Sequence, residues 1–133
     1  MKRNIDIGIL ITRISLGILM LLHGSAKLLN GLDFIKGMLT QAGLPSFIAY
    51  GVIFGEVIAP VVILIGFRAR IGAAFYAINC ISAILLAHSA DLFTINQFGG
   101  WTIELLGLYL FGSIALFFTG AGRYSVSKTN SWD

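Results

Sequence analysis

Four long apolar runs are the feature of this chain that most constrains its fold. They cover residues 5–29, 45–66, 71–88 and 100–120, and each approaches the roughly 20 residues that a helix needs to cross the hydrocarbon core of a bilayer. Only 11% of the residues are charged whereas 57% are hydrophobic, so there are too few polar side chains to cover a surface in water. The sequence therefore predicts an all-α membrane protein, in which residues 1–133 form a single bundle of four transmembrane helices.

The basic residues predict how this bundle is oriented. If the chain crosses four times, one side carries Lys2, Arg3, Arg68, Arg70, Arg123 and Lys128, and the other carries Asp33, Lys36 and Asp91. Short loops rich in Lys and Arg stay in the cytoplasm, so we expect both termini on the cytoplasmic side. The net charge of +3 is scattered in ones and twos between apolar runs, which indicates topology, with the lipid bilayer as partner and no nucleic acid. Trp101 and Tyr124 flank the fourth run, as aromatic rings at a membrane interface do.

The N-terminal run allows a second interpretation. Lys2, Arg3 and the apolar run before Gly24-Ser25-Ala26 also resemble a cleavable signal peptide. Arg13 interrupts the apolar core, however, and favours a permanent span.

Cys80 is the single cysteine, which excludes an intramolecular disulfide, a CxxC redox pair and a cysteine zinc cage. No metal site is predicted.

Five ionisable residues on the four predicted helices are candidates for a functional site: His23, Lys27, Glu56, His88 and Glu104. A charge at the centre of a span costs roughly 2.5 to 3.5 kcal/mol on insertion scales, so each needs a reason. Their depths place all of them in the outer half of the bundle. We expect a polar pocket there, in which Lys27 pairs with Glu56 or Glu104. Alternatively, Lys27 and His88 reach the headgroups separately.

Several other residues in the apolar runs predict how the helices pack. We expect Arg13 to extend to lipid phosphates at the cytoplasmic end. Pro60 has no N–H for the carbonyl of Glu56, which predicts a kink and a free carbonyl beside the carboxylate. The small residues Gly17 and Gly24 predict close helix contacts. Asn79 and Ser82 are expected to hydrogen-bond across the bundle.

These residues, in order, resemble the DoxX family of small bacterial membrane proteins. The resemblance rests on His23-Gly24, Lys27-Leu28, Gly43-Leu44-Pro45, Glu56, Gly66, Arg70, His88 and Gly120-Ala121-Gly122-Arg123-Tyr124-Ser125. It implies a four-helix fold in the bacterial inner (plasma) membrane and a role linked to quinone reduction. It also marks Lys27, Glu56 and Arg70 as the family's recurrent charged positions. We expect Arg70 to be a cytoplasmic anchor. The chain departs from the pattern at Ile58-Ala59-Pro60, where paired glycines are usual, and at Ser125-Val126-Ser127, where an aspartate is common.

Three functions are compatible with these residues. The first is a quinone-linked oxidoreductase subunit that uses His23, Lys27, Glu56, His88 and Glu104 to hold the cofactor and needs a redox partner protein for electrons. Haem is disfavoured, because His23 and His88 lie in no haem motif. The second is a non-enzymatic assembly or anchoring subunit. The third is a proton-coupled transporter working as a homo-oligomer, with Glu56 alternating between a proton and a cation.

Overall fold

The structure, a computed structural model, describes residues 4–133, and these residues are helical with one isolated β-bridge, between Ile95 and Trp101. The predicted all-α class is confirmed for this part of the chain. Lys2 and Arg3, which contributed to the predicted orientation, lie outside the described residues. The elements are, in order, α1 (Ile5–Asn30), α2 (Asp33–Gln41), η1 (Ser46–Ile48), α3 (Ala49–Ile53), η2 (Phe54–Ile58), α4 (Ala59–Ile65), α5 (Ala69–Ala87), η3 (Ser89–Asp91) and α6 (Glu104–Thr119).

Three helical segments are long and apolar enough to cross a membrane. They are Ile5–Asn30, the continuous segment Ser46–Ile65 formed by η1, α3, η2 and α4, and Ala69–Ala87. The fourth predicted run begins its helix only at Glu104 and has 16 helical residues, or about 24 Å against a hydrocarbon core of about 30 Å. Its first residues belong instead to a turn, in which Gly99 has a φ of 83° and the amide of Asn96 donates to the carbonyl of Gly100.

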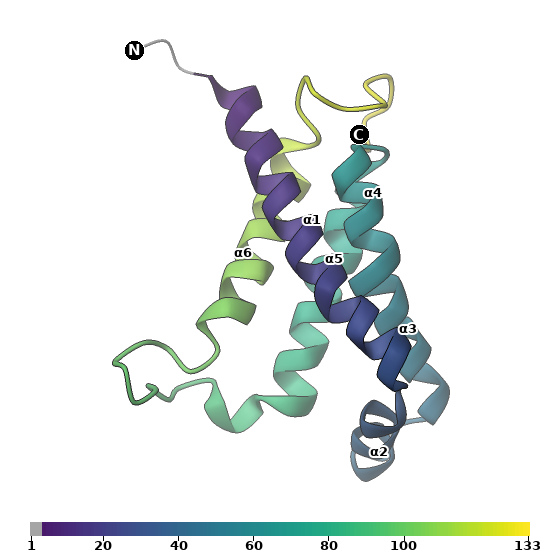
Figure 1. Cartoon of the computed structure of the whole chain (residues 1–133), viewed down its shortest axis with the longest axis vertical. Helices are drawn as coiled ribbons and strands as arrows, with labels where there is room; N and C mark the ends of the chain where they lie inside the picture. The colour runs from purple at the N-terminus through teal and green to yellow at the C-terminus, as the bar shows by residue number, and fades with distance from the viewer. Residues whose placement is uncertain (1–3) are drawn as a thin grey trace.

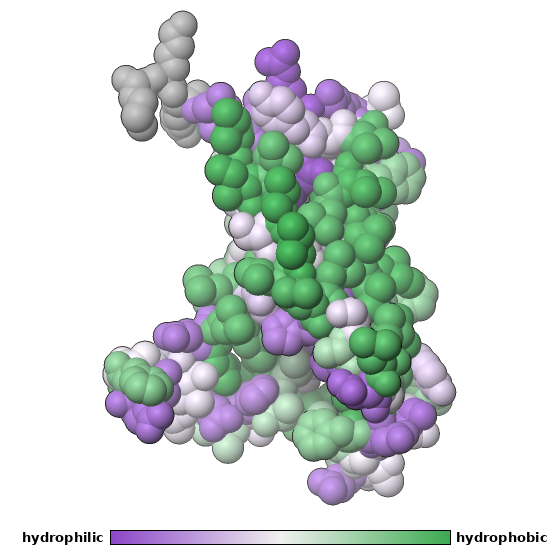
Figure 2. All heavy atoms as spheres, viewed as in Figure 1, coloured by the Kyte–Doolittle hydropathy of each residue, from purple (hydrophilic) through white to green (hydrophobic). Residues whose placement is uncertain are grey.

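The four long helical segments pack around a common core (Figure 1). Its buried residues come from every one of them: Leu16, Met20, Ala59, Ile63, Ala73, Tyr76, Cys80, Tyr109 and Leu116. The Tyr76 hydroxyl donates a hydrogen bond of 3.1 Å to the carbonyl of Leu16 on α1. Large apolar side chains face outward, as a lipid solvent allows. In Figure 2, apolar side chains cover the waist of the molecule and polar ones gather towards its ends.

Opposite ends of the bundle carry different parts of the chain (Figure 1). The beginning of α1, the α4–α5 joint (residues 66–68) and the C-terminal tail (residues 120–133) lie at one end. The other end carries α2 and the α5–α6 connection (residues 88–103). The tail binds the joint directly, because the amide of Val126 donates to the carbonyl of Ile65 and that of Ser127 to Gly66. The amide of Arg68 donates to Asp133 Oδ1 at 3.2 Å.

Arg13 does not extend to lipid, and the expectation that it does was wrong. Its side chain is buried, and its guanidinium donates to the carbonyls of Ile63, Leu64, Ala121 and Tyr124 at 2.6–2.8 Å. Ile63 and Leu64 lie in the last turn of α4, where carbonyls do not complete the regular helical pattern, and that of Ile63 also accepts from the amide of Gly66. Four carbonyls at one point therefore solvate the charge better than a lipid headgroup beyond the helix end would.

The close helix contacts predicted for the small residues are confirmed. A Cβ atom on Gly17 would overlap the side chain of Leu64, and one on Gly24 would overlap the carbonyl of Glu56. Gly66 ends α4 in a left-handed conformation with a φ of 69°. A side chain at this position would collide with the Arg13 guanidinium. The small residues of α1 are thus used within the chain, which brings α1 close to η2 and α4.

Candidate functional site

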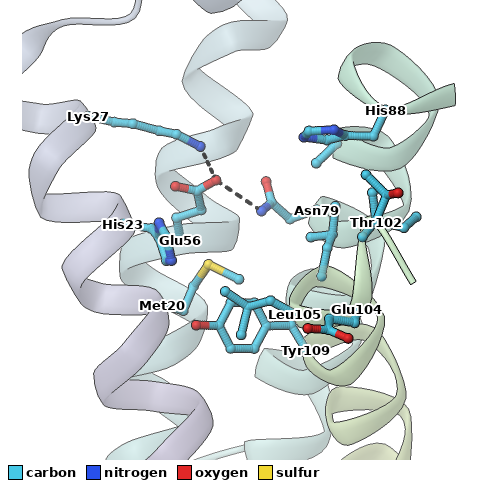
Figure 3. Close-up of a pocket in the computed structure, with 13 residues that line it drawn as sticks. Met20, His23, Lys27, Glu56, Asn79, His88, Thr102, Glu104, Leu105 and Tyr109 are labelled. Atoms are coloured by element: carbon cyan, nitrogen blue, oxygen red, sulfur yellow. Dashed lines mark hydrogen bonds and ion pairs between the residues drawn. The ribbon is translucent and has the colours of Figure 1, made fainter. Parts of the chain in front are cut away.

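The five ionisable residues singled out in the sequence lie around one cavity of about 420 Å³. His23 and Lys27 come from α1, Glu56 from η2, His88 from the end of α5, and Glu104 from the start of α6. Figure 3 shows their side chains approaching from different helices, together with Met20, Asn79, Thr102, Leu105 and Tyr109. The cavity lies in the part of the bundle nearer to α2 and the α5–α6 connection, away from the chain ends.

Lys27 forms an ion pair with Glu56, one of the two partners that the sequence allowed. The ammonium contacts Oε1 of the carboxylate, and Asn79 Nδ2 donates to the same oxygen at 3.4 Å. The Glu56 side chain is 6% exposed and that of Lys27 is 38% exposed. The second carboxylate oxygen, Oε2, is buried and has no hydrogen-bond partner among the described residues. A buried carboxylate oxygen without a donor is costly, so this atom is suited to a donor that a ligand brings.

A π-helical turn holds Glu56 at this position. Residues Phe54–Ile58 form η2, in which the amide of Ala59 donates to the carbonyl of Phe54, and Pro60 follows directly. The wider turn inserts one residue into the helix where Pro60 has no N–H to give. The carbonyl of Glu56 lies against Gly24. It therefore faces a helix contact and is not the free carbonyl that Pro60 predicted.

Aromatic residues form the floor of the cavity. The His23 ring meets the Tyr109 ring edge-to-face, with 6.1 Å between centroids, and Tyr109 meets Tyr76 in the same way at 6.1 Å. His88 lies at the rim, where its Nδ1 is 3.2 Å from Oδ2 of Asp91. The two histidines thus differ, since His23 packs on an aromatic ring and His88 is paired with a carboxylate.

Of the two partners expected for Lys27 the structure selects Glu56, and the expectation that Ser82 bonds across the bundle was wrong. Glu104 does not join the ion pair: it is the first residue of α6, and Figure 3 shows its carboxylate across the cavity from Lys27. Within residues 4–133 no ion pair involves it. Ser82 donates to the carbonyl of Ile78 in its own helix, which satisfies the hydroxyl locally. Asn79 does bond across the bundle, as predicted.

A second cavity of about 210 Å³ adjoins the first. It shares the side chains of Lys27, Glu56, Asn79 and His88 and continues beneath α2, where its lining is mostly apolar. Phe34, Ile35 and Met38 of α2 and Leu86 of α5 contribute that apolar part. The ion pair therefore lies between a wider chamber that has more polar groups and a narrower one that is mostly apolar.

Sequence reasoning did not identify several residues of the site. Tyr109, Met20 and Thr102 line the larger cavity, and Asp91 partners His88. Apolar or neutral residues inside an apolar run give no signal of their own, so only the packing of α1 against α6 reveals them. Among the described residues, no group of three or more His, Cys, Asp or Glu side chains lies close enough to hold a metal ion.

Comparisons with known proteins identify the family of this chain. The DoxX family model matches residues 8–89, which include four of the five cavity residues named from the sequence. The chain is 31% identical over 110 residues to the putative oxidoreductase CatD of Bacillus subtilis (strain 168). That alignment covers 83% of this chain and 81% of the relative. No solved structure gives a significant match.

Proposed function

The chain belongs to the DoxX family, and from that premise we propose that it is the quinone-binding membrane subunit of an oxidoreductase. Its relative CatD is named a putative oxidoreductase, which supports redox chemistry. The quinone assignment rests on the cavity itself. It has hydrogen-bond donors and one unpartnered acceptor around a chamber of about 420 Å³, within the usual range of roughly 300 to 1,000 Å³ for small-molecule pockets.

The observation that carries this proposal is the unpartnered Oε2 of Glu56 beside the Lys27 ammonium. A quinone presents carbonyl oxygens, which need donors, and a quinol presents hydroxyl groups, which need acceptors. Lys27 can donate to a carbonyl with the protons it does not share with Glu56, and the Glu56 carboxylate can accept from a hydroxyl once its side chain turns the buried Oε2 toward the chamber. One site can therefore hold both redox states, as a subunit that interconverts them requires.

The lining residues have distinct tasks in this proposal. Two electrons from a redox partner protein and two protons convert a bound quinone into a quinol. Lys27 and His23 supply protons to the ring oxygens, and His88 with Asp91 at the rim relays replacements from outside. Tyr109 and Met20 pack against the ring. The apolar chamber under α2 accommodates the side chain of a lipid-soluble quinone.

The proposal includes the membrane topology. α6, with the connection before it, makes a fourth crossing that brings the C-terminal tail back to the end where α1 begins. Arg68 and Arg70 at the α4–α5 joint and Arg123 and Lys128 in the tail lie at that end. By the positive-inside rule this end is cytoplasmic, and the cavity then opens in the outer half of a bacterial plasma membrane. Reporter fusions after Asp133 and at Gly43 test the two sides.

The deciding experiment is extraction of quinone from purified protein. The native protein, Glu56→Gln and His23→Ala are isolated in mild detergent, and quinone in organic extracts is measured per protein. Asp33→Asn is the matched control, because its carboxylate is 95% exposed and pairs with Lys36 outside the larger cavity. We expect quinone with the native protein and the control, and at least a tenfold loss in Glu56→Gln. Equal quinone in all four would contradict the proposed site, and no quinone in any would favour an assembly subunit.

A further inference from the structure

The connection between α5 and α6 is unusually apolar where it is most exposed. From Leu92 to Ile103 the chain has no Asp, Glu, Lys or Arg. Three large side chains project from this segment, with exposed fractions of 92% for Phe93, 74% for Ile95 and 86% for Phe98. The segment is a short hairpin, residues 92–103, from which these three apolar side chains project.

The hairpin satisfies much of its own backbone. The amide of Asn96 donates to the carbonyl of Gly100 and that of Thr102 to Thr94, and the side chain of Asn96 accepts from the amides of Phe98 and Gly100. The hydroxyl of Thr94 lies within hydrogen-bond distance of the carbonyl of Asp91 and of the hydroxyl of Thr102. A loop can enter the less polar part of a bilayer only if its backbone groups find partners within the protein, and this hairpin supplies many of them.

Trp101 fixes the hairpin to the bundle. Its Nε1 donates a hydrogen bond of 2.8 Å to the carbonyl of Leu92, which joins the two arms. Its ring lies on Gly107 of α6 so closely that a Cβ atom on Gly107 would overlap it. Trp101 therefore braces the hairpin against α6. The apolar tip is held in one orientation relative to α6.

The direction of the hairpin fits lipid better than water. Figure 1 shows it extending sideways from the end of α6, across the long axis of the helices, and reaching less far out than α2. α6 with its 16 residues is too short for the hydrocarbon core by itself. With the long helices spanning a bilayer, this direction would place the tip beside the bundle, in the region where amphipathic segments insert their apolar side chains.

We propose that the hairpin of residues 92–103 is a lipid-inserted anchor, with Phe93, Ile95 and Phe98 in the acyl-chain boundary of the outer leaflet. Thr102 and Ile103, at its inner arm, line the larger cavity. The anchor thus fixes the mouth of the cavity at lipid depth, and a ligand reaches it from the membrane. This inference rests on the exposure, charge and backbone bonding of the hairpin, and the choice of the outer leaflet rests on the topology proposed above. It is independent of which ligand the cavity binds.

A spin label at the tip tests the proposal. Phe98→Cys in a Cys80→Ala background is labelled and reconstituted in liposomes of phosphatidylethanolamine and phosphatidylglycerol at high dilution, so that neither a partner protein nor a second copy covers the tip. Accessibility to oxygen, which concentrates in lipid, is compared with accessibility to a water-soluble nickel chelate. Leu22→Cys on the outside of α1 (62% exposed) is the lipid reference, and Thr129→Cys in the exposed tail is the water reference.

We expect the Phe98 label to be oxygen-accessible like that at Leu22, and a nickel accessibility matching that at Thr129 would overturn the proposal. Protection that appears only at high protein density would also overturn it, in favour of a contact between copies. A second measurement avoids cysteines altogether. In Trp132→Phe, Trp101 is the sole tryptophan, and lipids brominated near the headgroup should quench it more than lipids brominated near the bilayer centre. No quenching by either lipid would contradict the anchor.

Discussion

The backbone of Gly24 on α1 lies directly against the main-chain carbonyl of Glu56 on η2, with no room for a Cβ atom between them. This contact sets the distance between the two elements that carry the ion pair. Lys27 follows Gly24 on α1 by less than one helical turn. The ammonium therefore reaches the Glu56 carboxylate only because a glycine lets the two backbones meet.

Gly24→Ala should destabilise the protein and weaken ligand binding together. The new methyl group would meet backbone and not a flexible side chain, so α1 must move away from η2, at a cost of about 1–3 kcal/mol in the free energy of unfolding. Gly8→Ala is the control, since nothing lies within 4 Å of a Cβ atom there. Unfolding in mixed micelles measures both variants. If Gly24→Ala lowers the free energy of unfolding no more than Gly8→Ala does, the contact between Gly24 and Glu56 is not tight.

Arg13→Met should be among the most destabilising single changes outside the cavity. It keeps an unbranched apolar side chain but removes the donors to the carbonyls of Ile63, Leu64, Ala121 and Tyr124. A buried carbonyl without a partner costs about 1–3 kcal/mol, so we expect a total loss above about 3 kcal/mol. Arg123→Met is the control, because that side chain is exposed. If the two variants unfold alike, the guanidinium does not hold the tail to α4.

Replacing Lys27 should lower the free energy of unfolding more when Glu56 is present than when Glu56 is also replaced. Lys27→Met leaves a carboxylate that is 6% exposed without its cation, which is destabilising, whereas Lys27→Met with Glu56→Gln leaves no charge. Because Lys27 is 38% exposed, we expect a coupling of about 1–2 kcal/mol rather than the larger values of fully buried pairs. A double-mutant cycle of unfolding free energies measures it. Additive single changes would show that the pair contributes no stability.

The helices and the polar residues of the site could be predicted from the sequence for one physical reason. A bilayer requires long apolar segments, and it makes every ionisable group inside them expensive, so both features are visible without a structure. His23, Lys27, Glu56, His88 and Glu104 were found in this way, and they do surround one cavity. Which residues pair depends on how the helices face one another, and the sequence left Glu56 and Glu104 as equal partners for Lys27.

Three features could not be predicted, because they depend on backbone groups. Arg13 is solvated by carbonyls, which every residue has and no sequence pattern distinguishes. The π-helical turn at Glu56 follows from Pro60 combined with the packing of Gly24. The hairpin that precedes α6 contains an apolar stretch from Gly100 to Ile103, which reads as the start of a helix until its hydrogen bonds are known.

The last residues of the C-terminal tail should loosen from the α4–α5 joint in acid. The Ser127 hydroxyl bonded to Oδ2 of Asp133, aided by the amides of Asn130 and Arg68, lowers the pKa of Asp133 below its ordinary value of 3.8. A lowered folded pKa means that the carboxylate stabilises the docked tail fully above 3.8 and loses this effect as the pH falls through the folded value. In NMR titrations, the amide signals of Asn130 and Arg68 should shift together with a midpoint below 3.8. Asp133→Asn should abolish that shared titration, and a midpoint at or above 3.8 would contradict the docking.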